Sequence, residues 1–263
     1  MAGGWLSSRD QQFTDATALN EYLLFLADDA LILGQQLSKW CSNGPELEQD
    51  IAIINTALDH IGRARLLYQE VANLLGGETT EDTLAYHRDH MEFRNLLLTE
   101  QPNGHWGDTL VRSFFLDTFH FFLYSELRSC SHAALAGIAE KSLKEIAYHA
   151  QWSAEWIVRL GDGTELSHQK VQKSIHDLWM WCGELFEDQE VLEHLDATFP
   201  KFSSLKKSWL DKVDEVLALA TLERPAEEEW HQTGGRKGVH SAHLGFILAE
   251  MQFLPRAYPD AKW

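Results

Sequence analysis

The residue types most able to do chemistry here are an acidic residue and a histidine three positions later. That spacing puts a carboxylate and an imidazole on one helix face, where both can bind one metal ion. Three pairs have it: Asp117 with His120, Glu165 with His168, and Glu228 with His231. Glu165 follows a helix-capping threonine and Glu228 lies in a polar connector, so only the first pair lies in an apolar helix. With 40 acidic residues and 13 histidines, one such pair is also expected by chance.

A second candidate surrounds His149. A ligand carboxylate should lie three residues before it, and that residue is Ile146. Glu145 lies four residues before His149, which is also a shared helix face. A hydrogen bond from Glu145 to His149, with Lys144 as a further partner, fits this spacing better than half of a two-metal site. The alternative is a satisfied, buried polar cluster.

Composition narrows the function classes. The formal net charge of −18 argues against binding to nucleic acid or to an anionic membrane. The sequence holds no Gly-x-x-x-x-Gly-Lys, Gly-x-Gly-x-x-Gly or Gly-x-Ser-x-Gly motif. Its three cysteines are far apart, which favours a reducing cytoplasm over a disulfide framework. We expect no signal peptide between Met1 and Asp10, and no apolar run reaches membrane-spanning length.

Apolar residues recur at three- and four-residue spacing almost throughout, which predicts an all-α protein. The predicted helices cover residues 18–40, 46–75, 79–98, 108–129, 132–160, 165–186, 203–222 and 243–258. Ser131 and Thr164 are predicted to cap the fifth and sixth helices. The first, second, fourth and fifth are long enough to form a four-helix core, with the others flanking it. Residues 233–238 look like the most flexible linker.

Many short segments, in one order along the chain, carry a resemblance to a known family. They are Leu31–Cys41, Pro45–Glu48, Ala57–Gly62, Glu81–Ala85, Asn95–Leu98, Glu100–Gly104, Lys144–Glu145, Tyr148–His149, Leu160–Thr164, Glu184–Phe186, Thr233–Gly238, His243–Gly245 and Ala249–Gln252. The sequence resembles the PaaC-type subunits of bacterial phenylacetyl-CoA oxygenases, also called epoxidases. The resemblance implies a single ferritin-like domain over residues 19–263, with residues 1–18 as an extension.

The same resemblance implies a function. PaaC-type subunits are regarded as structural, non-catalytic members of a complex that acts in aerobic phenylacetate catabolism. The partners it implies are a homologous catalytic subunit with a di-iron centre, other subunits including a reductase, and phenylacetyl-CoA near the subunit boundary. No catalytic residue and no bound cofactor are then expected in this chain. A homodimer of the isolated chain is a further possibility.

The candidate ligand positions agree with that expectation. Where the catalytic relatives carry Glu-x-x-His, this sequence has His60 and Arg63, and Arg63 would place a fixed cation where a metal would otherwise lie. The remaining degenerate positions are Asp117, His120, Glu145 and His149. An active di-iron oxygenase subunit with its own metal centre is the alternative. A ferritin-type storage protein is a third, for which the sequence gives no sign.

One binding segment also follows from the resemblance. It implies that a helix containing Glu92, Phe93, Arg94 and Asn95 lies near the bound acyl-CoA. Arg94 is the physically sensible contact because coenzyme A carries phosphates. The alternative is an ordinary solvated helix face.

Overall fold

A computed structural model describes residues 15–226, 230–259 and 261 of the chain. These residues form α-helices and short 3₁₀ helices and contain no strand, which confirms the all-α prediction. The α-helices are α1 (Asp15–Ser38), α2 (Leu47–Leu75), α3 (Glu81–Tyr86), α4 (Trp106–Leu127), α5 (Ala133–Gly161), α6 (Glu165–Trp179), α7 (Phe202–Leu219) and α8 (Ala242–Ala257). The 3₁₀ helices are η1 (His90–Glu92), η2 (Gly183–Phe186), η3 (Glu190–Glu193) and η4 (Gly235–Lys237).

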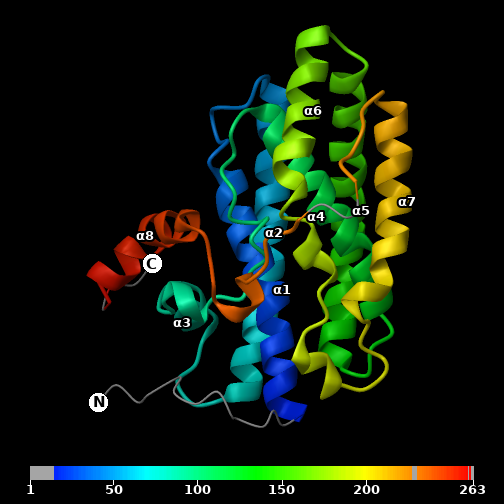
Figure 1. The fold of residues 1–263 in the computed structure, drawn as a ribbon. Helices are drawn as coiled ribbons and strands as arrows, with labels where there is room; N and C mark the ends of the chain where they lie inside the picture. Colours follow the sequence, from blue (N-terminus) through cyan, green and yellow to red (C-terminus); the bar gives the residue numbers. More distant parts are fainter. Residues whose placement is uncertain (1–14, 227–229, 260, 262–263) are drawn as a thin grey trace.

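Four long helices form the body of the molecule, as predicted. α1 packs along α2, α4 packs along α5, and α2 joins the two pairs by contacting α5 (Figure 1). The turns after α1 and α4 are short, so each pair is antiparallel. The connection from α2 to α4 is long: it carries α3 and η1 and runs the length of the bundle. Each of the four helices begins and ends within three residues of its predicted bounds.

Aromatic side chains fill the layer between α4 and the outer helices α6 and α7. α4 is buried on almost every side, because α5, α6 and α7 all contact it. The indole rings of Trp179 and Trp209 both pack on Phe115, and Trp209 Nε1 donates a hydrogen bond to the Phe115 carbonyl at 2.8 Å. A helix that is apolar all round is typical of such a central position.

The helix caps agree only in part with the sequence. The Thr164 side chain accepts a hydrogen bond from the backbone N–H of Ser167, which confirms it as the cap of α6. The prediction for α5 is wrong: α5 begins after His132, and the Ser131 hydroxyl bonds to Asp196 instead. That carboxylate lies 65 residues away in the sequence, so local spacing does not reveal it.

The predicted helix over residues 79–98 is wrong in its second half. Only Glu81–Tyr86 are α-helical, and the chain is extended after η1. There the backbone N–H groups of Arg94, Leu96 and Leu97 donate to carboxylates of Asp28, Asp29 and Glu184. Backbone donors satisfied by buried side chains do not need helical partners. Helix α6 likewise ends at Trp179 rather than continuing to Phe186.

Residues 233–238 are not a flexible linker. Gly235 and Arg236 are buried, and a Cβ on Gly235 would lie 2.2 Å from the Asn95 carbonyl oxygen. The Arg236 guanidinium donates to both carboxylate oxygens of Asp29, at 3.1 and 2.7 Å. This segment therefore fastens the C-terminal part of the chain to α1. None of the helices in the described part of the chain combines the length and hydropathy that a bilayer crossing needs.

Candidate functional site

Three buried polar side chains converge at the centre of the bundle, each from a different helix. His60 of α2, Asp117 of α4 and His149 of α5 each offer a potential ligand atom, and these atoms lie within 4.8 Å of one another. The two imidazole rings are 5.2 Å apart. Both oxygens of the Asp117 carboxylate lack a hydrogen-bond partner among the described residues, although His60 Nε2 approaches one of them to 3.6 Å. The group is therefore the strongest candidate for a metal site in the described part of the chain.

Arg63 supplies a fixed positive charge at this cluster. Its Nη2 lies 2.5 Å from His60 Nδ1, and its guanidinium lies 5.3 Å from the centre of the Tyr124 ring. A guanidinium can only donate, so His60 Nδ1 must accept and the proton of a neutral His60 is on Nε2. That nitrogen is the one facing Asp117. His60 consequently presents an N–H to the cluster, where a metal would need a lone pair.

His149 is held by a carboxylate on the neighbouring helix. Its Nε2 lies 3.0 Å from Asp59 Oδ2, while its Nδ1 is buried without a hydrogen-bond partner among the described residues. Asp59 is 38% exposed at its side chain, so this pair joins the buried cluster to the surface groove between α2 and α5. A carboxylate on the outer nitrogen of a histidine is also how metal-ligating histidines are commonly oriented.

Burial dominates the electrostatics of the cluster. It raises the pKa of Asp117, against the opposing effect of the nearby histidines and Arg63. It lowers the pKa of His60, and the positive charge of Arg63 lowers it further. Burial also raises the pKa of Tyr124 to about 12. Neutral imidazoles and a carboxylate compensated mainly by Arg63 follow from these directions.

The predicted ligand positions are only partly brought together. Asp117 and His149 meet in the cluster, but the His120 imidazole turns toward Asp29, with Nε2 3.8 Å from that carboxylate. The predicted hydrogen bond from Glu145 to His149 is wrong, because His149 bonds to Asp59. Glu145 lies partly buried in the groove beside that pair, and Lys144 is exposed.

The two other acidic–histidine pairs carry no ligand set. His168 Nδ1 bonds to the Gly161 carbonyl, and Glu165 accepts from Gln169 one turn later, as expected for a helix start. Glu228 lies outside the described residues. Asp59 was not predicted: it precedes His60, but its partner lies 90 residues away.

Two further carboxylates at the bundle centre come from α1 and are already paired. Asp28 binds the guanidinium of Arg88 and the Tyr68 hydroxyl, and Asp29 binds Arg236. A di-iron carboxylate site draws a glutamate from each of two helices and a Glu-x-x-His pair from each of two others. The cluster supplies one carboxylate and two imidazoles, and Ile146 is buried at the position where a further carboxylate would stand. The residues present do not fit a di-iron centre.

The segment Glu92–Asn95 differs from the expected solvated helix. η1 ends at Glu92, Phe93 and Asn95 are buried, and the chain here is extended. The Arg94 guanidinium binds Glu21 at 2.5 Å and donates to the carbonyls of Met91 and Phe93. Any phosphate reaching Arg94 would compete with these partners.

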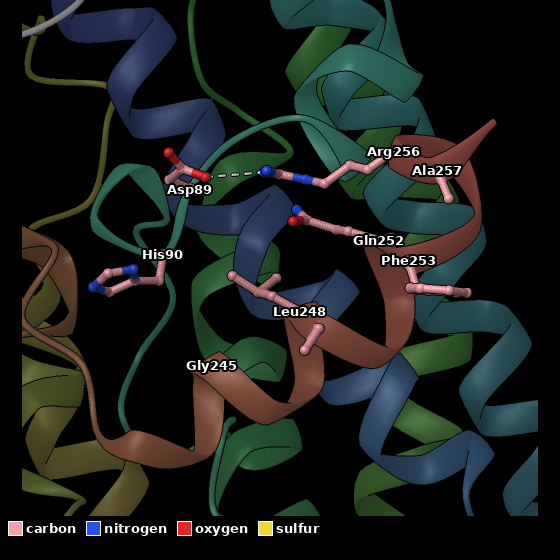
Figure 2. Close-up of a pocket in the computed structure, with 9 residues that line it drawn as sticks. Asp89, His90, Gly245, Leu248, Gln252, Phe253, Arg256 and Ala257 are labelled. Carbon is pink, nitrogen blue, oxygen red and sulfur yellow. Dashed lines mark hydrogen bonds and ion pairs between the residues drawn. The ribbon is translucent and has the colours of Figure 1, made fainter. Parts of the chain in front are cut away.

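Close to that segment, α8 and residues Asp89 and His90 enclose an open hollow of about 600 Å³ (Figure 2). Leu248 and Phe253 supply apolar surface, while Gln252 and Arg256 are its polar side chains from α8. Arg256 pairs with Asp89 and donates to the carbonyls of residues 86–88, and Gln252 donates to those of residues 85 and 88. These groups hold the C-terminal end of α3, so they are engaged within the chain.

Comparison with known proteins agrees along nearly the whole chain. The family model described as phenylacetic acid catabolic protein matches residues 7–263. A relative from Escherichia coli (strain K12), the component of 1,2-phenylacetyl-CoA epoxidase that is designated C, is 43% identical over 249 residues. That match covers 93% of this chain and 99% of the relative.

Proposed function

Because the chain belongs to the phenylacetic acid catabolic protein family, we propose that it is the PaaC-type subunit of a phenylacetyl-CoA epoxidase. We propose further that its role is structural and that a homologous di-iron subunit performs the oxidation. In this role the chain has no catalytic residue of its own and binds no cofactor. A reductase and the remaining subunits would complete a cytoplasmic complex that acts in phenylacetate catabolism.

A ferritin-like bundle is the architecture that suits this role. One long crossover between the second and third bundle helices is typical of ferritin-like folds. The connection from α2 to α4 has this form, and the crossing pairs Asp59–His149 and Glu70–His132 make α2 and α5 antiparallel. We propose that residues 19–263 form one such domain.

The position of Arg63 is the observation that carries the structural role. A guanidinium is always charged, and here it is buried and bonded to His60 within the cluster that would have to hold metal. It both fixes the proton of His60 on the inner nitrogen and repels a second cation. The charge of Asp117 is thereby compensated from within the chain.

A metal-binding subunit is the alternative, and the convergence of His60, Asp117 and His149 favours it. Two imidazoles and one carboxylate are a known donor set for a single divalent metal. To bind one, Arg63 would have to release His60, and its own charge would have to be displaced or tolerated.

Metal analysis of the purified chain distinguishes the two. We expect much less than one iron, zinc or manganese per chain, both for the chain alone and for the chain separated from its co-expressed partners. Epoxidase activity should require the other subunits. A stoichiometric metal that is lost in both Asp117→Ala and His149→Ala would refute the structural role.

Contact with the acyl-CoA through Glu92, Phe93, Arg94 and Asn95 remains a prediction. Of these, Arg94 carries the charge that a phosphate would bind, and its side chain is only slightly exposed. If it contacts coenzyme A in the complex, Arg94→Gln should raise the KM for the acyl-CoA while leaving assembly of the complex intact. An unchanged KM would remove this segment from the binding site.

A further inference from the structure

One face of the groove between α2 and α5 is apolar and uncovered by the described residues. Leu47, Ile51 and Leu58 follow one another on α2 at four- and seven-residue spacing, so they share a helix face, and each is more than half exposed. On α5, Tyr148 is also more than half exposed. Leu58 and Tyr148 each precede one member of the Asp59–His149 pair, so in antiparallel helices they emerge on the same side of the groove.

Two glycines lie on this same face. Gly62 follows Leu58 by one helical turn, and Gly137 precedes Tyr148 by three turns. A Cβ at either position would meet nothing within 4 Å, so packing within the described residues does not demand a glycine there. Glycine in a helix interior is less stable than alanine, so its presence calls for another cause. A bare backbone on an exposed apolar face allows another backbone to approach closely.

The centre of the face carries two carboxylates with few partners. Asp59 bonds only to His149 among the described residues, and Glu145 forms no hydrogen bond or ion pair within them. Lys141 lies near Glu145, and Arg63 lies beneath the groove, bonded to His60. Covering the groove would remove water from both carboxylates, which is unfavourable unless the covering surface brings a cation.

We propose that this α2–α5 face is the docking surface for an α-helix of a different epoxidase subunit, which presents a lysine or arginine to Asp59 and Glu145. The inference rests on the proposed function, which supplies the partner. A second copy of this chain fits less well, because a symmetric contact would oppose the same carboxylates in two molecules of net charge −18.

The test uses the full chain co-expressed with the other epoxidase subunits of its organism and measures the affinity of the reassembled complex. Leu58→Glu and Gly62→Leu should each weaken it by about 30-fold or more, as expected for central positions in an interface. Glu145→Lys should also weaken it. Gly62→Ala is the most discriminating variant: it should raise the unfolding midpoint of the chain alone and still weaken the complex.

Matched controls are Leu219→Glu on α7 and Phe253→Glu on α8, two similarly exposed apolar positions on other faces. Both should bind the partner as the unmodified chain does. If the unmodified chain binds no other subunit, the proposed function fails and the docking surface fails with it. If it binds while Leu58→Glu and Gly62→Leu bind equally well, only the docking surface is wrong. Loss of binding in Phe253→Glu alone, or loss of a self-dimer in Leu58→Glu, would also overturn it.

Discussion

Replacing Arg63 by methionine tests whether the bundle depends on an internal cation. The substitution keeps an unbranched side chain of similar length but removes the charge beside His60 and the contact with the Tyr124 ring. Asp117 then remains at the bundle centre with both oxygens lacking hydrogen-bond partners and with no guanidinium nearby to oppose its charge.

The expected loss of stability is about 3 kcal/mol, at the lower end of the roughly 3–5 kcal/mol found when one partner of a buried ionic group is removed. The lower end applies because burial already raises the pKa of Asp117, so the carboxylate can take up a proton instead of remaining charged. Typical domains have about 5–15 kcal/mol in total. With a urea dependence of roughly 3 kcal/mol per molar, the unfolding midpoint should fall by about 1 M.

Urea unfolding of a double-mutant cycle with Asp117→Asn measures the coupling. The two single substitutions together should cost at least about 1 kcal/mol more than the double variant does. The cost of Arg63→Met should also be smaller at pH 5 than at pH 8. An acid with a raised folded pKa contributes stability at low pH and loses it as the pH rises through that pKa.

Arg65→Met is the matched control on the same helix, because Arg65 is exposed and pairs with Glu81 only at 3.5 Å. It should change stability by less than about 1 kcal/mol. Should Arg63→Met be equally mild, or its effect simply add to that of Asp117→Asn, then Arg63 does not compensate Asp117 and the reasoning for a structural role fails.

Three further outcomes are expected. Burial lowers the pKa of His60 and of His120, so the unfolded chain binds protons that the folded chain refuses; the melting temperature should fall between pH 7 and pH 5, and a flat profile would contradict this. Arg236→Met should cost about 3 kcal/mol or more in thermal unfolding, because it strands the fully buried Asp29, and Arg236→Lys should recover only part of the loss. Ile146→Glu should destabilise the chain by about 2–4 kcal/mol, since it places a carboxylate at a fully buried position; recovery of that stability on adding ferrous iron would support the metal-binding alternative.

The long helices could be predicted because their signal is local. Apolar spacing predicts residues 46–75 and 132–160 as helices, and α2 and α5 cover almost the same ranges. Extended residues 93–98 could not be predicted in this way. Their composition suits a helix, and what prevents one is a set of carboxylates on α1 and η2 that bind their backbone N–H groups.

The candidate site divides along the same line. Asp117 and His149 could be selected from their spacing within apolar helices, but the same spacing pairs His149 with Glu145 on its own helix. The actual partner, Asp59, belongs to α2, and the pairing depends on how α2 and α5 lie against each other. The glycine-rich residues 233–238 are mispredicted for the same reason, because the partner of Arg236 lies 207 residues away on α1.

The arginines of this chain have a common relation to its buried carboxylates. Asp28 meets Arg88, Asp29 meets Arg236, and Asp117 lies within the electrostatic reach of Arg63. Two of these arginines come from the segments that cross outside the four-helix body, so the same contacts that neutralise α1 also fasten those segments to it. A bundle whose central acids are compensated internally can fold before it meets any ligand. Its remaining unsatisfied acids, Asp59 and Glu145, lie instead at the groove surface, where only another molecule can complete them. The distribution of charge therefore points outward, toward assembly, and away from chemistry at the centre.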